Sequence, residues 1–344
     1  MEFEMIDPTV FPDWDDILLC SGDNSFFHSS AWAKALSATY GYKPVYFSVI
    51  ENTKLVFLMP FMEISSPLTG KRGVSLPFSD RCEPYSPLRA FMKEAVQTAI
   101  WHGKRKNWKY LEWRDSRYFD RAAVVWKSFR THDLDLGRTE PEILSLLEKS
   151  NLRNIKKALR NGVTVKADGS RDSLKEFYRL NCATRRRQGL PPQPIAFFKN
   201  VFEHILSKGF GNIISAIHDG RTIAAALFFR FGSEAIFKYG ASDSRFLELR
   251  PNNLILWEAI ELYRSKGCRN LNLGRTEADN AGLLRFKRAW GTYESTIHYY
   301  RHDIRTGILQ DNPPKSDRWL KAGLSRAPKS ILRLIGQLAY KHIG

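Results

Sequence analysis

Three strand-like segments joined by two tight turns limit the fold of this chain more than any other feature. Segments 212–217, 222–231 and 234–240 are rich in apolar residues. A His-Asp-Gly-Arg turn at 218–221 separates the first two segments, and Gly-Ser at 232–233 separates the last two. Gly and Asp accept the backbone conformations that short hairpin turns require. These segments therefore predict a three-stranded antiparallel meander.

Helical segments flank the meander on both sides. Segment 195–208 has apolar residues on one face and is followed by Gly209, which is typical of a helix end. After the meander, Pro251 opens a helix that Gly267 closes, and a short strand at 271–273 comes next. Antiparallel strands followed by a helix and a further strand predict a mixed α/β fold.

The first part of the chain shows the same order of elements. Its expected elements are a helix that starts at Ser29 or Ser30, strands at 45–50, 55–64 and 74–78, a helix at 88–101, and a strand at 110–113. A capping box at Thr139 and Glu142 then opens a new helix. We therefore expect two similar α/β domains (α+β, with mixed sheets) at 1–140 and 141–310, followed by a basic tail at 311–344.

The excess positive charge is confined to the second part of the chain. Residues 1–140 contain 18 Lys and Arg against 18 Asp and Glu, whereas residues 141–344 contain 35 against 18 and carry the whole net charge of +17. This asymmetry favours an anionic partner, such as a phosphorylated substrate, RNA or a lipid headgroup. Simple solubility is the alternative explanation.

Several classes of protein are disfavoured by what the sequence lacks. The four cysteines are scattered without a C-x-x-C pair, so neither a zinc site nor a disulfide framework is indicated. The acidic first residues do not resemble a signal peptide, and no apolar run approaches the ~20 residues that span a bilayer. No local pattern predicts a Ser or Cys nucleophile. We expect a cytoplasmic protein without a metal.

The stretch 270–291 is the first candidate site, because a short strand, a polar loop and a helix follow one another there. Gly274-Arg275-Thr276 stands where the strand ends, and strand ends are common ligand sites in α/β folds. Arg275 and Lys287, on the following helix, could hold an anion between them.

Further cations cluster on two predicted helices. Arg185, Arg186 and Arg187 end a helix at 174–187, and four more lie on one face of a helix at 150–161. Cations are favoured near a helix C-terminus by its dipole, and a charged face is usually solvated. An ordinary structural role is therefore the alternative to anion binding.

Asn252 and Asn253 also have two interpretations. Either can cap the helix that Pro251 opens. Alternatively, they form part of a polar rim at which the N–H groups of the helix start face an anion.

The basic tail predicts an amphipathic helix, with apolar residues at 331, 332, 335, 338 and 343 and with Trp319 upstream. Segment 313–344 carries seven Lys and Arg and one Asp. Such a helix can lie on an anionic membrane surface, or it can dock on its own domain. The sequence leaves both open.

Four segments together resemble the FemAB-related proteins, a group of tandem GNAT-like acyltransferases that includes BioF2-like acetyltransferase domains. They are F-F-H-S-S-A-W at 26–32, S-L-P-F-S-D at 75–80, T-R-R-R-Q-G-L-P at 184–191, and L-R-P-N-N at 249–253 continuing through G-R-T at 274–276 to F-K-R-A-W-G at 286–291. The resemblance implies two GNAT-like domains and transfer of an acyl or aminoacyl group onto an amine. It also implies that Phe286 and Lys287 lie at the transfer site.

The best-known members of this group add amino acids from aminoacyl-tRNA to peptidoglycan precursors, and others are associated with exopolysaccharide production. We therefore expect an acyl- or aminoacyltransferase that forms an amide on an anionic cell-envelope or exopolysaccharide precursor. Aminoacyl-tRNA and acyl-CoA are the candidate donors. The acceptor would be phosphorylated or lipid-linked, and the protein would contact the inner face of the membrane peripherally through 313–344.

The candidate residues are assigned roles on this hypothesis. Lys287 would stabilise the negative charge that develops on the carbonyl oxygen, with Phe286 beside it. The remaining candidates would bind the substrate or line its pocket: Arg185, Arg186, Arg275, Tyr239, Asn252, Trp290 and Asp80. Asp80 and Glu277 are the candidate general bases. Two alternatives stay open, an acetyl-CoA-dependent N-acetyltransferase and a non-catalytic protein that binds RNA or a membrane surface.

Overall fold

The computed structural model describes residues 3–22, 25–87, 91–114, 119, 123–311 and 323–344. The chain forms two compact units. The first comprises Met1–Phe129, Thr296–Lys315 and Leu338–Gly344, and the second comprises Arg130–Ser295 and Ser316–Gln337.

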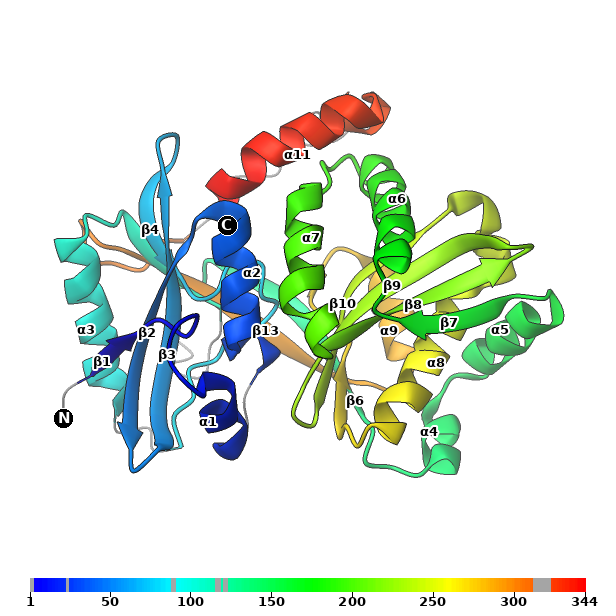
Figure 1. Ribbon diagram of the computed structural model, residues 1–344, viewed down its shortest axis with the longest axis horizontal. Coiled ribbons are helices and arrows are strands. Elements are labelled where there is room, and N and C mark those ends of the chain that lie inside the picture. Colours follow the sequence, from blue (N-terminus) through cyan, green and yellow to red (C-terminus); the bar gives the residue numbers. More distant parts are fainter. Residues whose placement is uncertain (1–2, 23–24, 88–90, 115–118, 120–122, 312–322) are drawn as a thin grey trace. The chain divides into compact units, whose positions relative to one another are not determined.

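The first unit contains a mixed sheet with the strand order β1-β2-β3-β4-β5-β13 (Figure 1). Its helices and strands are β1 (Glu4–Ile6), α1 (Trp14–Cys20), α2 (Ser30–Tyr40), β2 (Lys43–Glu51), β3 (Lys54–Ser66), β4 (Gly70–Val74), α3 (Met92–Arg105), β5 (Tyr110–Trp113) and most of β13 (Tyr293–Asp303). Neighbouring strands are antiparallel, except that β4 and β5 are parallel.

The second unit contains a sheet with the order β6-β11-β10-β9-β8-β7. Its elements are β6 (Lys127–Asp135), α4 (Glu140–Leu146), α5 (Lys149–Arg160), β7 (Thr164–Asp168), α6 (Arg171–Arg187), α7 (Ile195–His204), β8 (Gly211–His218), β9 (Arg221–Phe231), β10 (Glu234–Ser242), α8 (Pro251–Ser265), β11 (Asn270–Asn272), β12 (Thr276–Glu277) and α9 (Ala281–Arg288). In this strand order β10 and β11 are parallel, and the other neighbouring strands are antiparallel. Both units thus place a parallel strand after an antiparallel meander, and the predicted fold class is confirmed.

Turn chemistry explains the register of both meanders. Asp219 and Gly220 have φ values of 48° and 70°, and Asn52 and Thr53 have values of 49° and 63°. Two successive left-handed residues are typical of the type I′ turns that match the twist of a two-residue hairpin. The predicted turn at 218–221 is confirmed, and a second turn of this kind joins β2 to β3.

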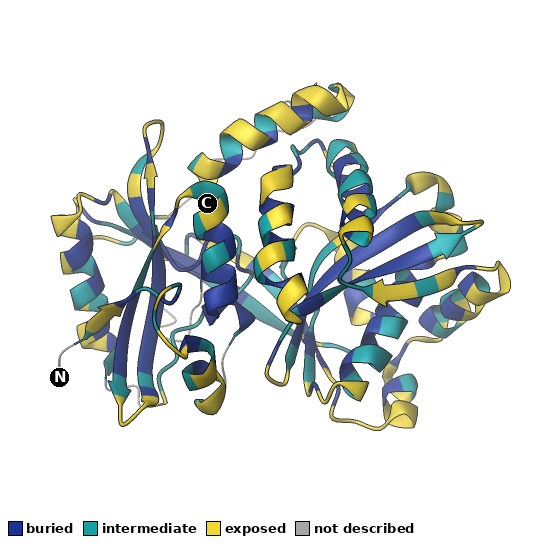
Figure 2. Cartoon of the chain, viewed as in Figure 1, coloured by how far each residue is buried: buried dark blue, intermediate teal, exposed yellow. Residues whose placement is uncertain are grey.

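Strands β8 and β9 are buried on both faces, which Figure 2 shows as dark ribbons within the second unit. Residues Ile214 and Phe228 face the core that also contains Ile255 and Ala259 of α8. Helix α6 packs on β9 and β10. Because successive side chains of a strand point to opposite faces, such a sheet needs apolar residues at nearly every position.

Two strand predictions need correction. The strand expected at 74–78 is β4, which ends at Val74, and the chain then turns through Leu76 and Phe78 with φ values of 50° and 62°. The apolar residues of this turn gave a sequence pattern like that of a strand. In addition, β6 and β7 were not predicted, because charged residues interrupt their apolar alternation.

The units differ from the domain boundaries expected from the sequence. The predicted capping box at Thr139 and Glu142 is present, but the units separate between Phe129 and Arg130, within β6. Residues 296–315 belong to the first unit, in which the last four residues of β13, Tyr300–Asp303, pair with β5. Of the predicted tail, 312–322 including Trp319 lies outside the described residues, and helix α11 spans Lys329–Ile343.

Buried histidines make the free energy of unfolding depend on pH. Burial lowers the pKa of His28 from its ordinary 6.5 to about 4. Between these values the unfolded chain binds a proton that the folded protein does not, so stability is complete above pH 6.5 and falls as the pH decreases toward 4. We expect urea unfolding to give a free energy about 2 kcal/mol lower at about pH 5 than at about pH 7.5 from this residue alone. The variant His28→Leu should show a correspondingly weaker pH dependence, and an equal dependence in both proteins would contradict the assignment.

Candidate active site

Lys287 is a buried cation at the end of strand β11. Its side chain belongs to α9, whose start is capped by Asn280 accepting from the Leu283 N–H at 3.2 Å. Lys287 is only 3% exposed. Its Nζ donates to the carbonyl oxygen of Gly274 at 2.7 Å and to that of Arg275 at 3.5 Å. The ammonium is therefore held beside the strand end that the sequence singled out.

A histidine–carboxylate pair lies in the same unit and was not predicted from the sequence. His132, on β6, has a completely buried side chain whose Nε2 lies 2.9 Å from Oε2 of Glu294. Arg288 donates two hydrogen bonds to Glu294, at 2.6 and 2.8 Å, and the pKa of Glu294 falls to about 2, chiefly because of Arg288. Burial, and next the charge of Lys287, lower the pKa of His132. A neutral imidazole beside an ionised carboxylate is an arrangement that general bases use.

A cavity of about 490 Å³ lies in the second unit, and we call it the arginine pocket. Its cationic lining residues are Arg179, Arg186, Arg187, Arg221, Arg245 and Lys329. Among the described residues that line it, Asp243 alone is acidic. The pocket thus carries a large excess of positive charge, which favours an anionic ligand.

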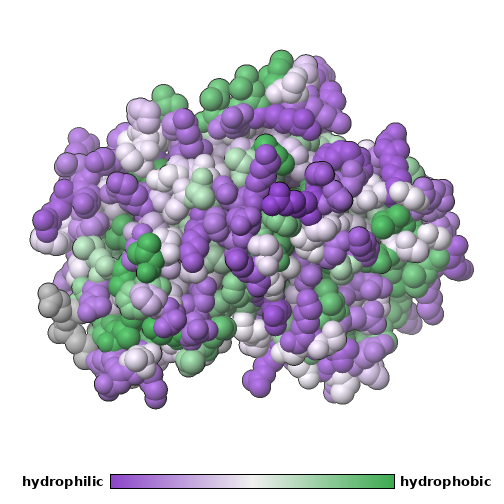
Figure 3. All heavy atoms as spheres, viewed as in Figure 1, coloured by the Kyte–Doolittle hydropathy of each residue, from purple (hydrophilic) through white to green (hydrophobic). Residues whose placement is uncertain are grey.

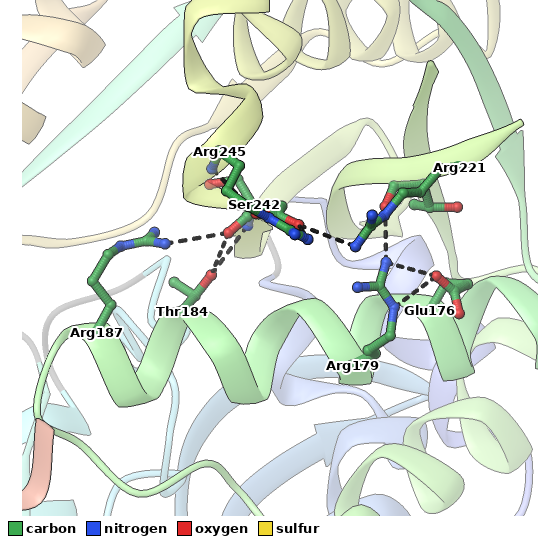
Figure 4. Close-up of polar contacts among 9 residues, drawn as sticks. Glu176, Arg179, Thr184, Arg187, Arg221, Ser242 and Arg245 are labelled. Carbon is green, nitrogen blue, oxygen red and sulfur yellow. Dashed lines mark hydrogen bonds and ion pairs between the residues drawn. The ribbon is translucent and has the colours of Figure 1, made fainter. Parts of the chain in front are cut away.

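Helix α6 and the end of β10 build the arginine pocket (Figure 4). On α6, Arg186 and Arg187 follow Arg179 by seven and eight residues. This spacing is about two helical turns, so all three lie on one side of the helix. Thr184 of α6 exchanges hydrogen bonds with the backbone of Ser242 at 3.1 and 3.2 Å, and Arg187 donates to the same carbonyl at 3.4 Å. These contacts fix the helix against the strand end.

The charges inside the pocket are only partly compensated. Asp243 accepts from Arg245 at 3.0 and 2.7 Å and forms an ion pair with Arg221 at 3.5 Å. The hydrogen bonds from Arg245 are the main reason that the pKa of Asp243 falls to about 2. The Nε atom of Arg186 is buried and, in the part of the chain that the structure describes, has no hydrogen-bond partner. A ligand oxygen could satisfy this donor.

The structure brings some of the predicted residues together near Lys287. Arg275 is half-buried at the end of β11, and Phe286 is half-buried with its ring centroid 6.2 Å from that of Trp290. Trp290 itself is 0% exposed and belongs to the core of the second unit. Glu277 is exposed in β12.

Other predicted residues lie elsewhere. Arg186 lines the arginine pocket, whereas Arg185 donates from Nε to the Pro191 carbonyl at 3.3 Å. Tyr239 packs its ring against Phe198 at 5.8 Å. Asp80 belongs to the first unit, where its backbone carbonyl accepts from Tyr299 at 2.7 Å.

The helix-cap prediction at Asn252 or Asn253 is wrong. The cap of α8 is Arg250, with a left-handed φ of 60°. Asn252 is the second residue of α8 and half-buried, and Asn253 donates instead to the side chain of Asn151 at 2.8 Å. Pro251 at the first helical position needs no N–H partner, so α8 starts before either asparagine.

Comparisons with known proteins show what this chain resembles. Residues 149–288 match the acetyltransferase (GNAT) domain family. The chain is 21% identical over 232 residues to a lipid II:glycine glycyltransferase of Staphylococcus aureus, an alignment that covers 46% of this chain and 55% of the relative. The solved structure of FemX resembles it with a TM-score of 0.67 at 15% identity, covering 87% of this chain and 97% of FemX. Residues 149–288 therefore match a GNAT domain, and the chain shares the fold of FemX.

A tandem GNAT protein from the clavulanic acid biosynthesis pathway shares the fold of this chain as well. Its TM-score is 0.54 at 11% identity, with 91% of this chain and all of the other covered. The chain spans about half the length of the curated relative that it matches. The GNAT match begins at α5 and ends one residue after Lys287, so Lys287 and most of the arginine pocket lie within it.

The described residues of this chain contain neither a membrane-spanning helix nor a metal cluster. None of the helices that the structure describes is both long and apolar enough to cross a membrane. Within the same residues, no group of three or more His, Cys, Asp or Glu side chains is arranged to hold a metal ion.

Proposed function

We propose that this chain is an acyl- or aminoacyltransferase that forms an amide on a phosphorylated or lipid-linked acceptor of the cell envelope or of an exopolysaccharide. The observation that carries the proposal is the buried ammonium of Lys287, held 2.7 Å from the Gly274 carbonyl oxygen at a strand end inside the GNAT match. The name of the Staphylococcus aureus relative, a lipid II:glycine glycyltransferase, supports this class of acceptor.

The chemistry requires a fixed positive charge near the reacting carbonyl. An acceptor amine attacks an activated ester or thioester, negative charge develops on the carbonyl oxygen, and the alcohol or thiol leaves as the amine loses a proton. An ammonium that is already oriented needs no reorganisation when this charge appears, and preorganised stabilisation is usually the largest catalytic term. Lys287 supplies such an ammonium.

The proton of the attacking amine needs an acceptor. His132 is a further candidate, because burial and the neighbouring charge of Lys287 lower its pKa and Glu294 orients its completely buried ring. Glu277 is exposed on β12, and Asp80 stays a candidate from the first unit. Each remains part of the proposal.

The arginine pocket would bind the anionic group of a substrate. Guanidinium groups match phosphate oxygens with paired N–H donors, and a buried donor such as Nε of Arg186 favours an oxygen ligand. A lipid-linked acceptor would bring the protein to the inner membrane surface, so the proposal includes peripheral contact there. Aminoacyl-tRNA and acyl-CoA are the alternative donors, and calorimetry with acetyl-CoA distinguishes them, because binding would favour the N-acetyltransferase alternative.

We predict that the double variant Arg186→Gln/Arg187→Gln binds inorganic pyrophosphate at least about tenfold more weakly than the unaltered chain, since each charge-assisted hydrogen bond contributes about 1.5–3 kcal/mol. Isothermal calorimetry measures the change. The matched control is Arg153→Gln/Arg160→Gln, which removes the same charge from two exposed positions on α5. An equal loss in both variants would show that only net charge matters, and the pocket would then have no specific role.

A further inference from the structure

Helix α11 is anchored by one face. Leu332 is 1% exposed and Tyr340 is 5% exposed, and Gly336 between them is also buried. The spacing of four residues puts all three on one side of the helix. Gly336 belongs to the second unit, and a Cβ there would meet the carbonyl oxygen of Pro192 of the same unit. Tyr340 belongs to the first unit, and its backbone carbonyl accepts from Tyr42 of that unit. This face of α11 therefore packs against the rest of the protein.

The outer side of the same helix carries apolar residues that docking does not use. Ile331, Leu334 and Leu338 are 49%, 56% and 56% exposed. They follow a spacing of three and four residues, so they form one stripe along the helix. Figure 2 shows α11 largely as exposed, and Figure 3 shows hydrophobic side chains gathered along the edge where α11 runs. Exposed aliphatic stripes of this kind mark interaction surfaces.

The charges on and next to α11 have one sign. Residues 323–344 contain no acidic side chain, and Arg326 and Lys341 are exposed. Lys329 lines the arginine pocket, and the guanidinium of Arg333 lies over the Tyr178 ring. The whole chain has a net charge of +17. A second copy of this chain would bring the same positive charges against them, whereas an anionic lipid surface would be attracted.

We propose that α11 is the membrane-docking element of this protein and that its outer stripe enters the surface of an anionic bilayer. At about 1.5 Å per residue, its 15 residues are about 22 Å long. This length suits a helix that lies in the interface with its aliphatic side chains among the acyl chains and with Lys341 at the phosphates.

Docking through α11 would place the arginine pocket close to the lipid headgroups. Lys329, the first residue of α11, and Ser325, four residues before it, line the arginine pocket. A role for docking in catalysis rests on the proposed transfer to a lipid-linked or phosphorylated acceptor. The inference deepens the proposed function by naming the element that would make its membrane contact, and vesicle binding can be measured without donor or acceptor.

Vesicle co-sedimentation of the full chain tests the inference. We expect binding to vesicles of mixed phosphatidylglycerol and phosphatidylcholine, little binding to phosphatidylcholine alone, and weaker binding at high salt. The variant Leu334→Gln/Leu338→Gln should bind at least about tenfold more weakly, because two side chains lose their transfer from water to hydrocarbon. The control Leu68→Gln alters a side chain that is 75% exposed outside this helix and should bind unchanged.

Three outcomes would overturn the inference: no binding of the unaltered chain to anionic vesicles, equal binding by the stripe variant, or equal loss in the Leu68→Gln control. Light scattering after gel filtration adds a further check. A dimer that the stripe variant dissociates would show that a second copy covers the stripe. Circular dichroism checks that each variant is folded. Vesicle binding does not measure acyl transfer, so a failure to bind vesicles would not decide the proposed reaction, which has its own test.

Discussion

Replacing Lys287 with methionine is expected to lower the rate of acyl transfer by at least about 10²-fold while leaving a folded protein. Removal of one preorganised donor at a developing oxyanion costs about 2.7–4 kcal/mol of transition-state stabilisation in comparable sites. Methionine keeps most of the volume of the buried side chain, so the packing around α9 is preserved. The Gly274 carbonyl loses the donor that now lies 2.7 Å away, which should cost about 1–3 kcal/mol in the free energy of unfolding.

A matched control separates charge from position. Arg285 lies on the same helix, two residues before Lys287, and is exposed. The variant Arg285→Met therefore removes one cation from the surface and leaves the buried Lys287 in place. We expect this variant to transfer at the normal rate. Rates are measured with lipid II as acceptor, and unfolding by urea is measured in parallel. Normal turnover of the Lys287→Met protein would exclude Lys287 from the mechanism.

Replacing Trp290 with alanine is expected to lower the free energy of unfolding by about 3–5 kcal/mol, which is the usual cost of deleting a large buried aromatic side chain. Trp290 is 0% exposed and belongs to the core that contains Ile143, Leu256 and Ile260. The following residue, Gly291, has a φ of 69° and no room for a Cβ beside Leu146, so the chain cannot shift easily to fill the cavity. Urea unfolding at neutral pH measures the loss.

The Trp290 variants also test the substrate-binding role predicted for this residue. Trp290→Phe keeps an apolar ring in the core and should lose much less stability than Trp290→Ala. If Trp290 acts mainly on substrate, both variants should instead raise KM at unchanged stability. That second result would contradict a core role.

Much of the fold could be predicted because its local signals are strong. The left-handed turn at Asp219 and Gly220 and the capping box at Thr139 are both present where the sequence predicts them. Strand β6 was missed, since Arg130 and Asp133 interrupt its apolar pattern. With the strand, His132 was missed as well, and its partner Glu294 lies 162 residues further along the chain. Local spacing carries no information about such a pair.

The arginine pocket, too, could be predicted only in part from local sequence. The run of three arginines at the end of α6 predicts an anion site, and Arg186 does line the pocket. Arg185 donates instead to the Pro191 carbonyl, because it points about 160° away from Arg187 around the helix. Arg221 and Arg245 join the pocket only through the pairing of β9 with β10 and the loop that follows.

The most direct test of the account is transfer itself. The full chain is incubated with lipid II or a nucleotide-linked precursor sugar, and with either a mixture of aminoacyl-tRNAs or acyl-CoAs, and the mass of each acceptor is measured. We predict that one acceptor gains the mass of an aminoacyl or acyl group, and that the gain disappears with Lys287→Met and persists with Arg285→Met. Acceptors of unchanged mass with every donor, from a folded protein whose arginine pocket binds pyrophosphate, would contradict the account.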